Sequence, residues 1–239
     1  MELLAIMGRG IQMSGDGWDP TDVSSWVPTR PYEITDEQGM HLSVRHPREN
    51  RPDVYADPQA RIGGGLWNLR AGVILIKRHH PNLVVCAYGH RSSYLTSVDG
   101  PTESEVMHYH LGHECKLGDT KPLVWPRERT EPGPSNTGSE IKHVLDLGLE
   151  RGFRNIAILT VGVHVPRTGA YVSKYLTTHP QYGRLNVRIL ESEEIIAVEC
   201  PWERNTIAEV RNSLAFEHSW RAEAIGISKI ICGVYQDFA

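Results

Sequence analysis

Residues 155–161, with the sequence NIAILTV, decide the fold, and Gly162-Val163-His164 follows them directly. The stretch is almost entirely apolar, and its isoleucine, threonine and valine residues favour an extended backbone. A short apolar run that stops at a glycine is typical of a strand buried on both faces of a sheet. We therefore predict a central strand of a parallel sheet at this point of the chain.

Other short apolar runs lie on either side of this strand and alternate with amphipathic segments. The runs predict strands at residues 3–7, 82–88, 121–125, 185–190 and 229–235. Helical spacing of apolar residues predicts helices at about residues 66–79, from 102, from 135 to Gly152, 167–178 and 206–217. Strands that alternate with helices indicate an α/β fold with a mostly parallel sheet and helices on both faces.

Residues 11–61 depart from this alternation. They show little periodicity, and Pro, Asp, Gly and Arg recur among them. We interpret them as a long loop insertion after the first strand, which is either a lid over a site or a decoration of the fold. No Ser/Gly-rich linker divides the 239 residues, so we expect residues 1–239 to form a single domain.

Composition excludes several classes of protein. The formal charge of −4 is spread along the chain without a basic stripe, which argues against a nucleic-acid partner. The four cysteines, Cys86, Cys115, Cys200 and Cys232, form no CxxC pair, and reduced thiols are the simplest interpretation. The N-terminus lacks the pattern of a signal peptide, and no apolar run approaches the ~20 residues of a membrane span. We expect a cytoplasmic protein without a membrane partner.

The residues that follow the strands are the first candidates for a ligand site. In parallel sheets ligands lie beyond the carboxyl ends of the strands. Gly8-Arg9-Gly10 and Gly89 follow two predicted strands, and His164 and Arg167 follow the central one. Histidine titrates near neutral pH, and arginine binds phosphate or carboxylate groups. His164 is therefore a candidate acid/base, and Arg167, with Arg9, a candidate anion ligand; surface turns are the alternative in each case.

Polar residues at two predicted helix starts face the same edge of the sheet. They are Ser104 and Glu105 in one helix, and Asn136, Thr137 and Glu140 in the other. The spacing Thr137-x-x-Glu140 is that of a capping box, so Glu140 has a structural interpretation as well as a functional one. The same ambiguity holds for Glu105.

Two further patterns give weaker signals. His108-x-His110-x-x-His113 places only the last two histidines on one helix face, and no acidic or cysteine partner completes the spacing of a zinc site. We favour a solvated helix face over a metal site here. The serines lack the GxSxG context of a serine hydrolase.

The order of the motifs resembles the YdcF/SanA/ElyC-like family. The matching stretches are AIMGRG, GGGLWNLRAGVIL, VVCAYG, SEVM, NTGSE and ILTVGVHVPR, within roughly residues 3–176. The resemblance implies a three-layer Rossmann-like fold and a ligand pocket. The residues that it places in this pocket are Gly8, Gly89, Ser104, Glu105, Asn136, Thr137, Glu140, His164 and Arg167.

The family includes a member associated with S-adenosylmethionine and others that are linked to envelope biogenesis and carry a membrane anchor. S-adenosylmethionine is therefore the cofactor or ligand that the resemblance implies. The chain departs from the family pattern in its shortened Ser104-Glu105-Val106-Met107 motif, in the insertion at residues 11–61 and in the lack of an anchor.

These observations lead to one principal hypothesis and two alternatives. The principal one is a small-molecule enzyme that hydrolyses or transfers a group on a nucleotide-like or phosphorylated substrate, with His164 as acid/base and Glu105 or Glu140 orienting it or binding hydroxyls. The first alternative is a non-catalytic protein that binds S-adenosylmethionine or a nucleotide. The second is a metal-dependent hydrolase that uses His164 with Glu105 or Glu140.

Overall fold

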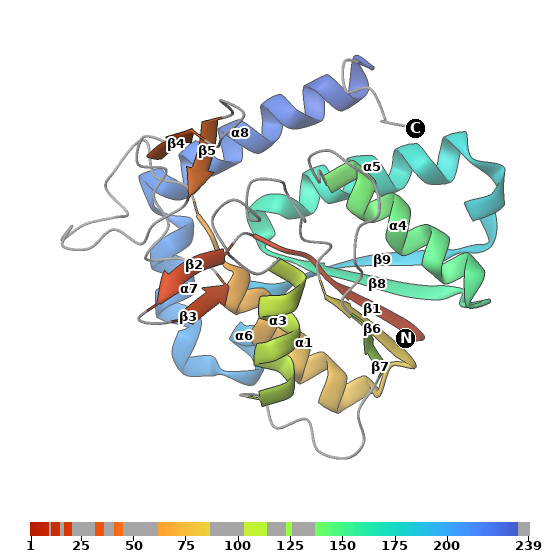
Figure 1. The fold of residues 1–239 in the computed structure, drawn as a ribbon, viewed down its shortest axis with the longest axis horizontal. Helices are drawn as coiled ribbons and strands as arrows, with labels where there is room; N and C mark the ends of the chain where they lie inside the picture. The colour runs from red at the N-terminus through yellow and green to blue at the C-terminus, as the bar shows by residue number, and fades with distance from the viewer. Residues whose placement is uncertain are drawn as a thin grey trace.

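A computed structural model of the chain describes residues 1–9, 11–14, 17–20, 32–35, 41–44, 62–86, 103–113, 123–125 and 137–233. Its centre is a parallel sheet with the strand order β7-β6-β1-β8-β9 (Figure 1). The strands are β1 (Leu3–Ile6), β6 (Leu83–Cys86), β7 (Leu123–Trp125), β8 (Asn155–Thr160) and β9 (Asn186–Glu191). The NIAILT stretch forms β8, as predicted, and Val161 follows the strand.

The order of the strands creates a switch point beside β1. The chain runs from β1 outward through β6 to β7, and then returns to place β8 on the other side of β1. Ala5 of β1 therefore lies in register with Val85 on one side and Ile158 on the other. Because the connections diverge here, a crevice is expected outside the carboxyl ends of β1 and β8, where ligands bind in open parallel sheets.

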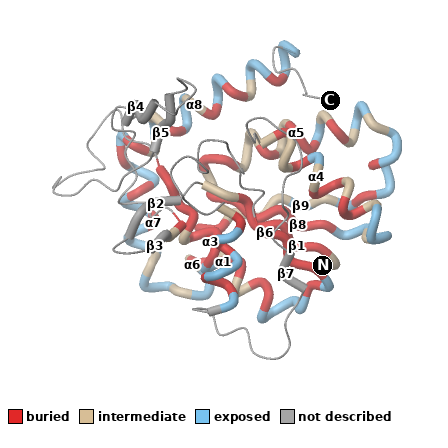
Figure 2. The backbone as a smooth tube through the Cα atoms, viewed as in Figure 1, coloured by how far each residue is buried: buried red, intermediate tan, exposed pale blue. Residues whose placement is uncertain are grey.

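Helices cover both faces of the sheet (Figure 1). On one face, Leu4 and Ile6 of β1 pack in a core with α1 (Gly65–His79), α3 (Glu103–His113) and α6 (Ser192–Glu199). On the other face, Leu3 and Ala5 pack with α4 (Thr137–Glu150) and α5 (Val165–Thr178). Figure 2 shows the central strands buried between these helices. Successive side chains of a strand point to opposite faces of the sheet, so β1 contributes to both hydrophobic cores.

The C-terminal region differs from the sequence-based prediction. In place of one helix at residues 206–217, the structure has α7 (Arg204–Arg211) and α8 (Leu214–Ile231). The Ser213 side chain accepts a hydrogen bond from the Phe216 N–H at 3.1 Å and so starts a new helix. The strand predicted at 229–235 is wrong over the residues described, because Lys229-Ile230-Ile231 continues α8. Of these three residues only Ile230 is buried.

The insertion at residues 11–61 contains regular structure where it is described. β2 (Ile11–Ser14) pairs antiparallel with β3 (Gly17–Pro20), and β4 (Tyr32–Thr35) with β5 (His41–Val44). The prediction of a loop is wrong for these segments; the rest of the insertion lies outside the described residues. Each of these strands has only 4 residues, which is too short for an alternation of apolar and polar residues to stand out, so the pattern did not reveal them.

Short 3-10 turns join the remaining elements: η1 (Gly162–His164), η2 (Pro180–Arg184) and η3 (Pro201–Glu203). Within the described part of the chain, no helix has the length and apolar character needed to span a membrane.

Cys86, Cys200 and Cys232 are free thiols, as expected, and burial raises the pKa of Cys86 to about 12. Cys115 lies outside the described residues.

Candidate functional site

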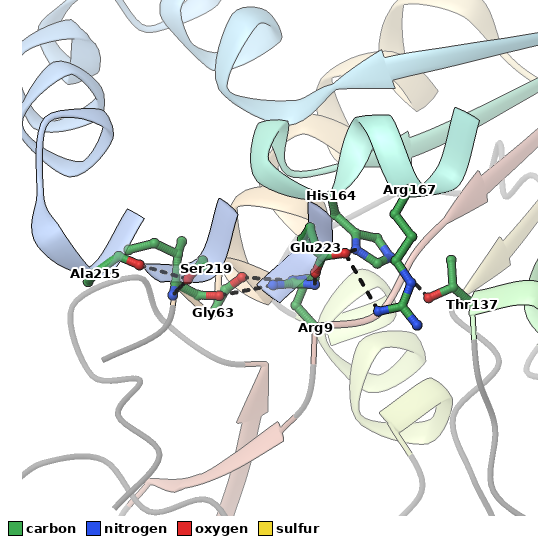
Figure 3. A network of polar contacts seen from close by, with 9 residues as sticks. Arg9, Gly63, Thr137, His164, Arg167, Ala215, Ser219 and Glu223 are labelled. Atoms are coloured by element: carbon green, nitrogen blue, oxygen red, sulfur yellow. Dashed lines mark hydrogen bonds and ion pairs between the residues drawn. The ribbon is translucent and has the colours of Figure 1, made fainter. Parts of the chain in front are cut away.

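A network of polar side chains gathers at the carboxyl ends of β1 and β8 (Figure 3). Arg9 follows β1, and His164 and Arg167 follow β8. Thr137 begins α4, and Glu223 reaches the same point from α8. The network thus lies at the switch point of the sheet, where the strand order predicts a ligand site.

The turn after β8 holds His164 in place. The Gly162 N–H donates to both carboxylate oxygens of Glu193, at 2.8 and 3.0 Å. The His164 N–H donates to the Val161 carbonyl at 2.9 Å, and Pro166 lies in the first turn of α5, where its missing N–H costs nothing. His164 is consequently buried, with 5% of its surface exposed.

Glu223 is the centre of the network. Its Oε2 atom lies 3.0 Å from His164 Nδ1 and 3.6 Å from an Nη atom of Arg167, and its Oε1 atom lies 3.4 Å from an Nη atom of Arg9. Figure 3 shows the carboxylate between these three side chains. Glu223 is itself buried. A buried carboxylate needs such partners, since an isolated one is strongly destabilising.

The environment fixes the protonation states of the pair. Burial lowers the pKa of His164, and the positive charges of Arg9 and Arg167 add to this effect, although the hydrogen bond to Glu223 opposes it. Burial alone would raise the pKa of Glu223, but its hydrogen bond to His164 and the neighbouring positive charges lower it to about 2. At neutral pH the pair is therefore an ionised glutamate and a neutral imidazole.

The ionised carboxylate favours one tautomer of the neutral imidazole. His164 Nδ1 lies 3.0 Å from Glu223 Oε2, and an ionised carboxylate attracts a proton on the nitrogen that faces it. In the tautomer with the proton on Nδ1, Nε2 carries the lone pair. An imidazole with a lone pair on one nitrogen and an oriented N–H on the other is the arrangement of a general base.

Arg9 anchors Glu223 to the rest of the fold. Its Nε atom donates to the Gly63 carbonyl at 3.2 Å, and an Nη atom donates to the Ile62 carbonyl at 3.1 Å. The Ile62 N–H in turn donates to Ser219 Oγ of α8 at 2.7 Å. Arg9 thus donates hydrogen bonds to groups of the protein itself, and these contacts indicate that it positions Glu223.

Two more residues complete the surroundings of His164 and Arg9. Thr137 Oγ1 lies 3.3 Å from His164 Nε2, and the threonine is partly buried. Gly8, beside Arg9, closely approaches Glu103 of α3: a Cβ atom at Gly8 would lie 2.3 Å from the carboxyl carbon of Glu103. The glycine therefore leaves room for a carboxylate at the end of β1.

The structure brings together four of the residues predicted from sequence: Arg9, Thr137, His164 and Arg167. Ser104 is buried in α3, Glu105 is exposed on the same helix, and Glu140 lies in the first turn of α4. The carboxylate in contact with His164 is Glu223, whereas the sequence analysis assigned this role to Glu105 or Glu140. Gly10, Gly89 and Asn136 lie outside the described residues.

Sequence reasoning missed Glu223 because of the composition of α8. The buried residues of this helix are Ala215, Ser219, Glu223, Gly226 and Ile230. Their spacing of three and four residues is helical, but only two of the five are apolar, so a search for hydrophobic periodicity does not detect the face. The sequence feature that could have indicated this helix is Ser213, a typical N-cap residue, followed by small and polar residues at helical spacing.

The histidine motif of α3 has a different environment from the one predicted. His108 is exposed, but His110 is buried, and its Nε2 atom lies 3.0 Å from Asp19 Oδ1 of β3. The expectation of a solvated face is thus wrong for His110, which attaches the first hairpin of the insertion to α3. Among the described residues, no group of three or more His, Cys, Asp or Glu side chains could hold a metal ion.

Comparisons of the chain with protein-family models, with curated proteins and with solved structures return no match. The resemblance to the YdcF-like family stays a prediction. The functional argument therefore depends on the geometry of the site.

Proposed function

We propose that this chain is a YdcF-like, Rossmann-like small-molecule enzyme that hydrolyses or transfers a group on an anionic, phosphorylated or nucleotide-like substrate. The observation that carries the proposal is the contact of the buried His164 with Glu223 at the switch point of the sheet. The pair places an imidazole beside the carboxylate that orients it, and the lowered pKa of His164 keeps this imidazole unprotonated at neutral pH, as a general base must be.

Arg167 supports the choice of an anionic substrate. It lies on α5 one turn beyond His164, with its side chain partly exposed, whereas Arg9 is bound to backbone carbonyls. A guanidinium group at the edge of a parallel sheet can bind a phosphate or carboxylate through two hydrogen bonds. In this proposal Arg167 binds the anion and Arg9 positions Glu223.

Turnover by His164 variants tests the enzymatic proposal. His164→Ala should lower turnover of nucleotides, sugar phosphates or p-nitrophenyl phosphate by about 100-fold or more, the usual effect of losing a general base. His79→Ala is the matched control, since His79 is exposed at the far end of α1 and should retain full activity. Full turnover by His164→Ala would contradict the proposal.

Ligand binding tests the substrate class independently of turnover. A ligand at about 100 times its dissociation constant adds about 2.7 kcal/mol to the free energy of unfolding, which raises the melting temperature by roughly 5–10 °C. We expect such a shift with a nucleotide, a sugar phosphate or S-adenosylmethionine, and its loss in Arg167→Ala. Binding without turnover would instead favour a non-catalytic nucleotide or S-adenosylmethionine protein.

A further inference from the structure

The hydroxyl of Thr137 is in hydrogen-bond contact with the imidazole of His164. Thr137 is the first residue of α4, and its Oγ1 atom lies 3.3 Å from His164 Nε2 (Figure 3). On its other side the same imidazole contacts Glu223 through Nδ1 at 3.0 Å. A carboxylate, an imidazole and a hydroxyl thus lie in one row of close polar contacts, with the hydroxyl at its outer end.

The direction of the hydrogen bond between Thr137 and His164 depends on the imidazole tautomer. With the proton on Nδ1, beside the ionised carboxylate of Glu223, Nε2 has no proton and accepts. The only proton available for the contact of Nε2 with Thr137 is that of the threonine hydroxyl. Thr137 therefore donates its O–H to the imidazole, which is the direction in which a base withdraws a proton from a nucleophile.

The position of Thr137 adds a second contribution. The first turn of an α-helix directs backbone N–H groups toward its N-terminus, and the helix dipole makes this end positive. Negative charge that develops on Oγ1, or on a group attached to it, is stabilised at this end of α4. A positive helix end and an oriented base thus act on the same oxygen atom.

We propose that Thr137 is the nucleophile of this enzyme, and that the reaction proceeds through a covalent ester on its Oγ1 atom. The inference rests on the proposed function, since it assigns a second catalytic residue to the same site. Thr137, His164 and Glu223 then form a hydroxyl–imidazole–carboxylate triad, a geometry that recurs on unrelated folds.

The two half-reactions balance as follows for a phosphate ester. Thr137 Oγ1 forms a bond to phosphorus while its proton passes to His164 Nε2, and the bond from phosphorus to the leaving oxygen breaks. The leaving oxygen takes the electron pair and the proton from Nε2. A water or an acceptor alcohol then gives its proton to Nε2 and bonds to phosphorus, and Oγ1 leaves and recovers that proton.

A phosphonofluoridate probe tests this inference without knowledge of the substrate. Attack by an activated hydroxyl displaces fluoride and leaves a stable phosphonate ester, which mass spectrometry of the intact protein and of its peptides locates. We expect one adduct per chain, on Thr137. Thr137→Ser should also be labelled, Thr137→Val should not, and His164→Ala should react about 100-fold more slowly or worse.

Thr178→Val is the matched control. Thr178 Oγ1 also lies beside an imidazole, 2.7 Å from His179 Nδ1, but at the exposed end of α5. This variant should be labelled on Thr137 at the wild-type rate. The melting temperature of each variant establishes that it is folded, and Thr137→Ser keeps the hydroxyl if valine is not tolerated.

The outcomes separate this inference from the proposed function. An adduct on another residue, or none on folded wild-type protein, overturns the role of Thr137. Undiminished turnover in Thr137→Val, together with loss of turnover in His164→Ala, also overturns it, but supports direct attack by water with His164 as the base. Full turnover in His164→Ala contradicts the proposed function itself.

Discussion

Glu223 holds three groups of the site in a single arrangement. It orients His164 and offsets the charges of Arg9 and Arg167, although it lies on a helix far from them in sequence. Removing one partner of a buried ionic network leaves the others uncompensated, which costs more than the loss of the contacts alone. The stability of the fold and the chemistry of the site therefore depend on the same carboxylate.

Glu223→Gln should lower the free energy of unfolding by about 3 kcal/mol at pH 7, because the mostly buried guanidinium groups of Arg9 and Arg167 lose an ion-pair partner. Urea unfolding measures this value. Glu217→Gln on the same helix is the control: Glu217 is exposed and pairs with Arg221 one turn away, so its loss should cost less than about 0.5 kcal/mol. Equal effects of the two substitutions would contradict a central role for Glu223.

The effect of Glu223→Gln should also depend on pH. The pKa of Glu223 is lowered in the folded state to about 2, so its stabilisation is complete above the unfolded value near 4.5 and is lost as the pH falls toward 2. The difference between wild type and variant should therefore be constant from pH 5 to pH 7 and shrink at pH 3. A difference that stays constant to pH 3 would indicate another cause.

Glu193 should give a pH dependence of the opposite sign. Burial raises its pKa to about 7, although the Gly162 N–H and Arg9 oppose this effect. A carboxyl group whose pKa is raised on folding loses stabilisation as the pH increases from about 4.5 through 7. Urea unfolding measures this trend. Relative to wild type, the free energy of unfolding of Glu193→Gln should rise by about 2 to 3 kcal/mol between pH 4.5 and pH 8. The exposed Glu194→Gln should show a much smaller trend, because the charge of Glu194 is the last of the causes that shift the pKa of Glu193.

At the scale of the element, α8 positions the site through its smallest residue. A Cβ atom at Gly226 would lie 3.1 Å from two atoms of the Arg167 guanidinium group. Glycine in a helix costs roughly 0.5–1 kcal/mol relative to alanine. The close approach of Arg167 explains why this helix keeps a glycine in its buried face.

Gly226→Ala should therefore fail to stabilise the protein, because the gain in helix propensity is offset by displacement of Arg167. Gly112→Ala on α3 is the control: a Cβ atom there has no neighbour within 4 Å among the described residues, and the variant should gain roughly 0.5–1 kcal/mol in urea unfolding. In Gly226→Ala the nucleotide-induced thermal shift should also decrease. If Gly226→Ala and Gly112→Ala raise the free energy of unfolding equally, Gly226 does not constrain Arg167.

The elements differ in how well the sequence predicted them. β8 combines β-branched residues with burial along its length, so propensity and pattern agree. The same agreement placed β1 and α5. Together with β8, these elements bring Arg9, His164 and Arg167 to one edge of the sheet. In α8 the pattern is weak because its buried face consists of alanine, serine, glutamate and glycine as well as isoleucine. Glu223 could not be placed, since tertiary contacts with distant residues determine its role.

At the scale of the whole molecule, Arg9 links segments that are far apart in the chain. It contacts Glu223, 214 residues away, and the carbonyl groups of Ile62 and Gly63, where the insertion returns to the sheet. The Ile62 N–H bonds to Ser219 of the same C-terminal helix. The end of β1, residues 62–63 and α8 are thus held together by the partly buried side chain of Arg9 and its neighbours.

Arg9→Lys tests whether this link controls the local opening of the fold. Lysine retains the charge, but a single ammonium group cannot reproduce the directed donors that bind two carbonyls and a carboxylate at once. Loss of about 1–2 kcal/mol of local stability corresponds to amide exchange roughly 10-fold faster. We expect this increase at residues 62–69 and 214–223, as measured by hydrogen exchange with mass spectrometry, and unchanged exchange in β8 and β9.

Arg70→Lys provides the comparison for Arg9→Lys, since Arg70 is also paired with a glutamate, Glu203, but is exposed on α1. Its substitution should leave exchange at residues 62–69 within twofold of wild type, because exposed ion pairs contribute little. Uniform acceleration throughout the sheet in Arg9→Lys would instead mean that the whole fold is destabilised. Unchanged exchange would mean that the carbonyl contacts of Arg9 contribute nothing. Acceleration confined to the two linked segments is the result that identifies Arg9 as the connection between residues 62–69 and the polar network around Glu223.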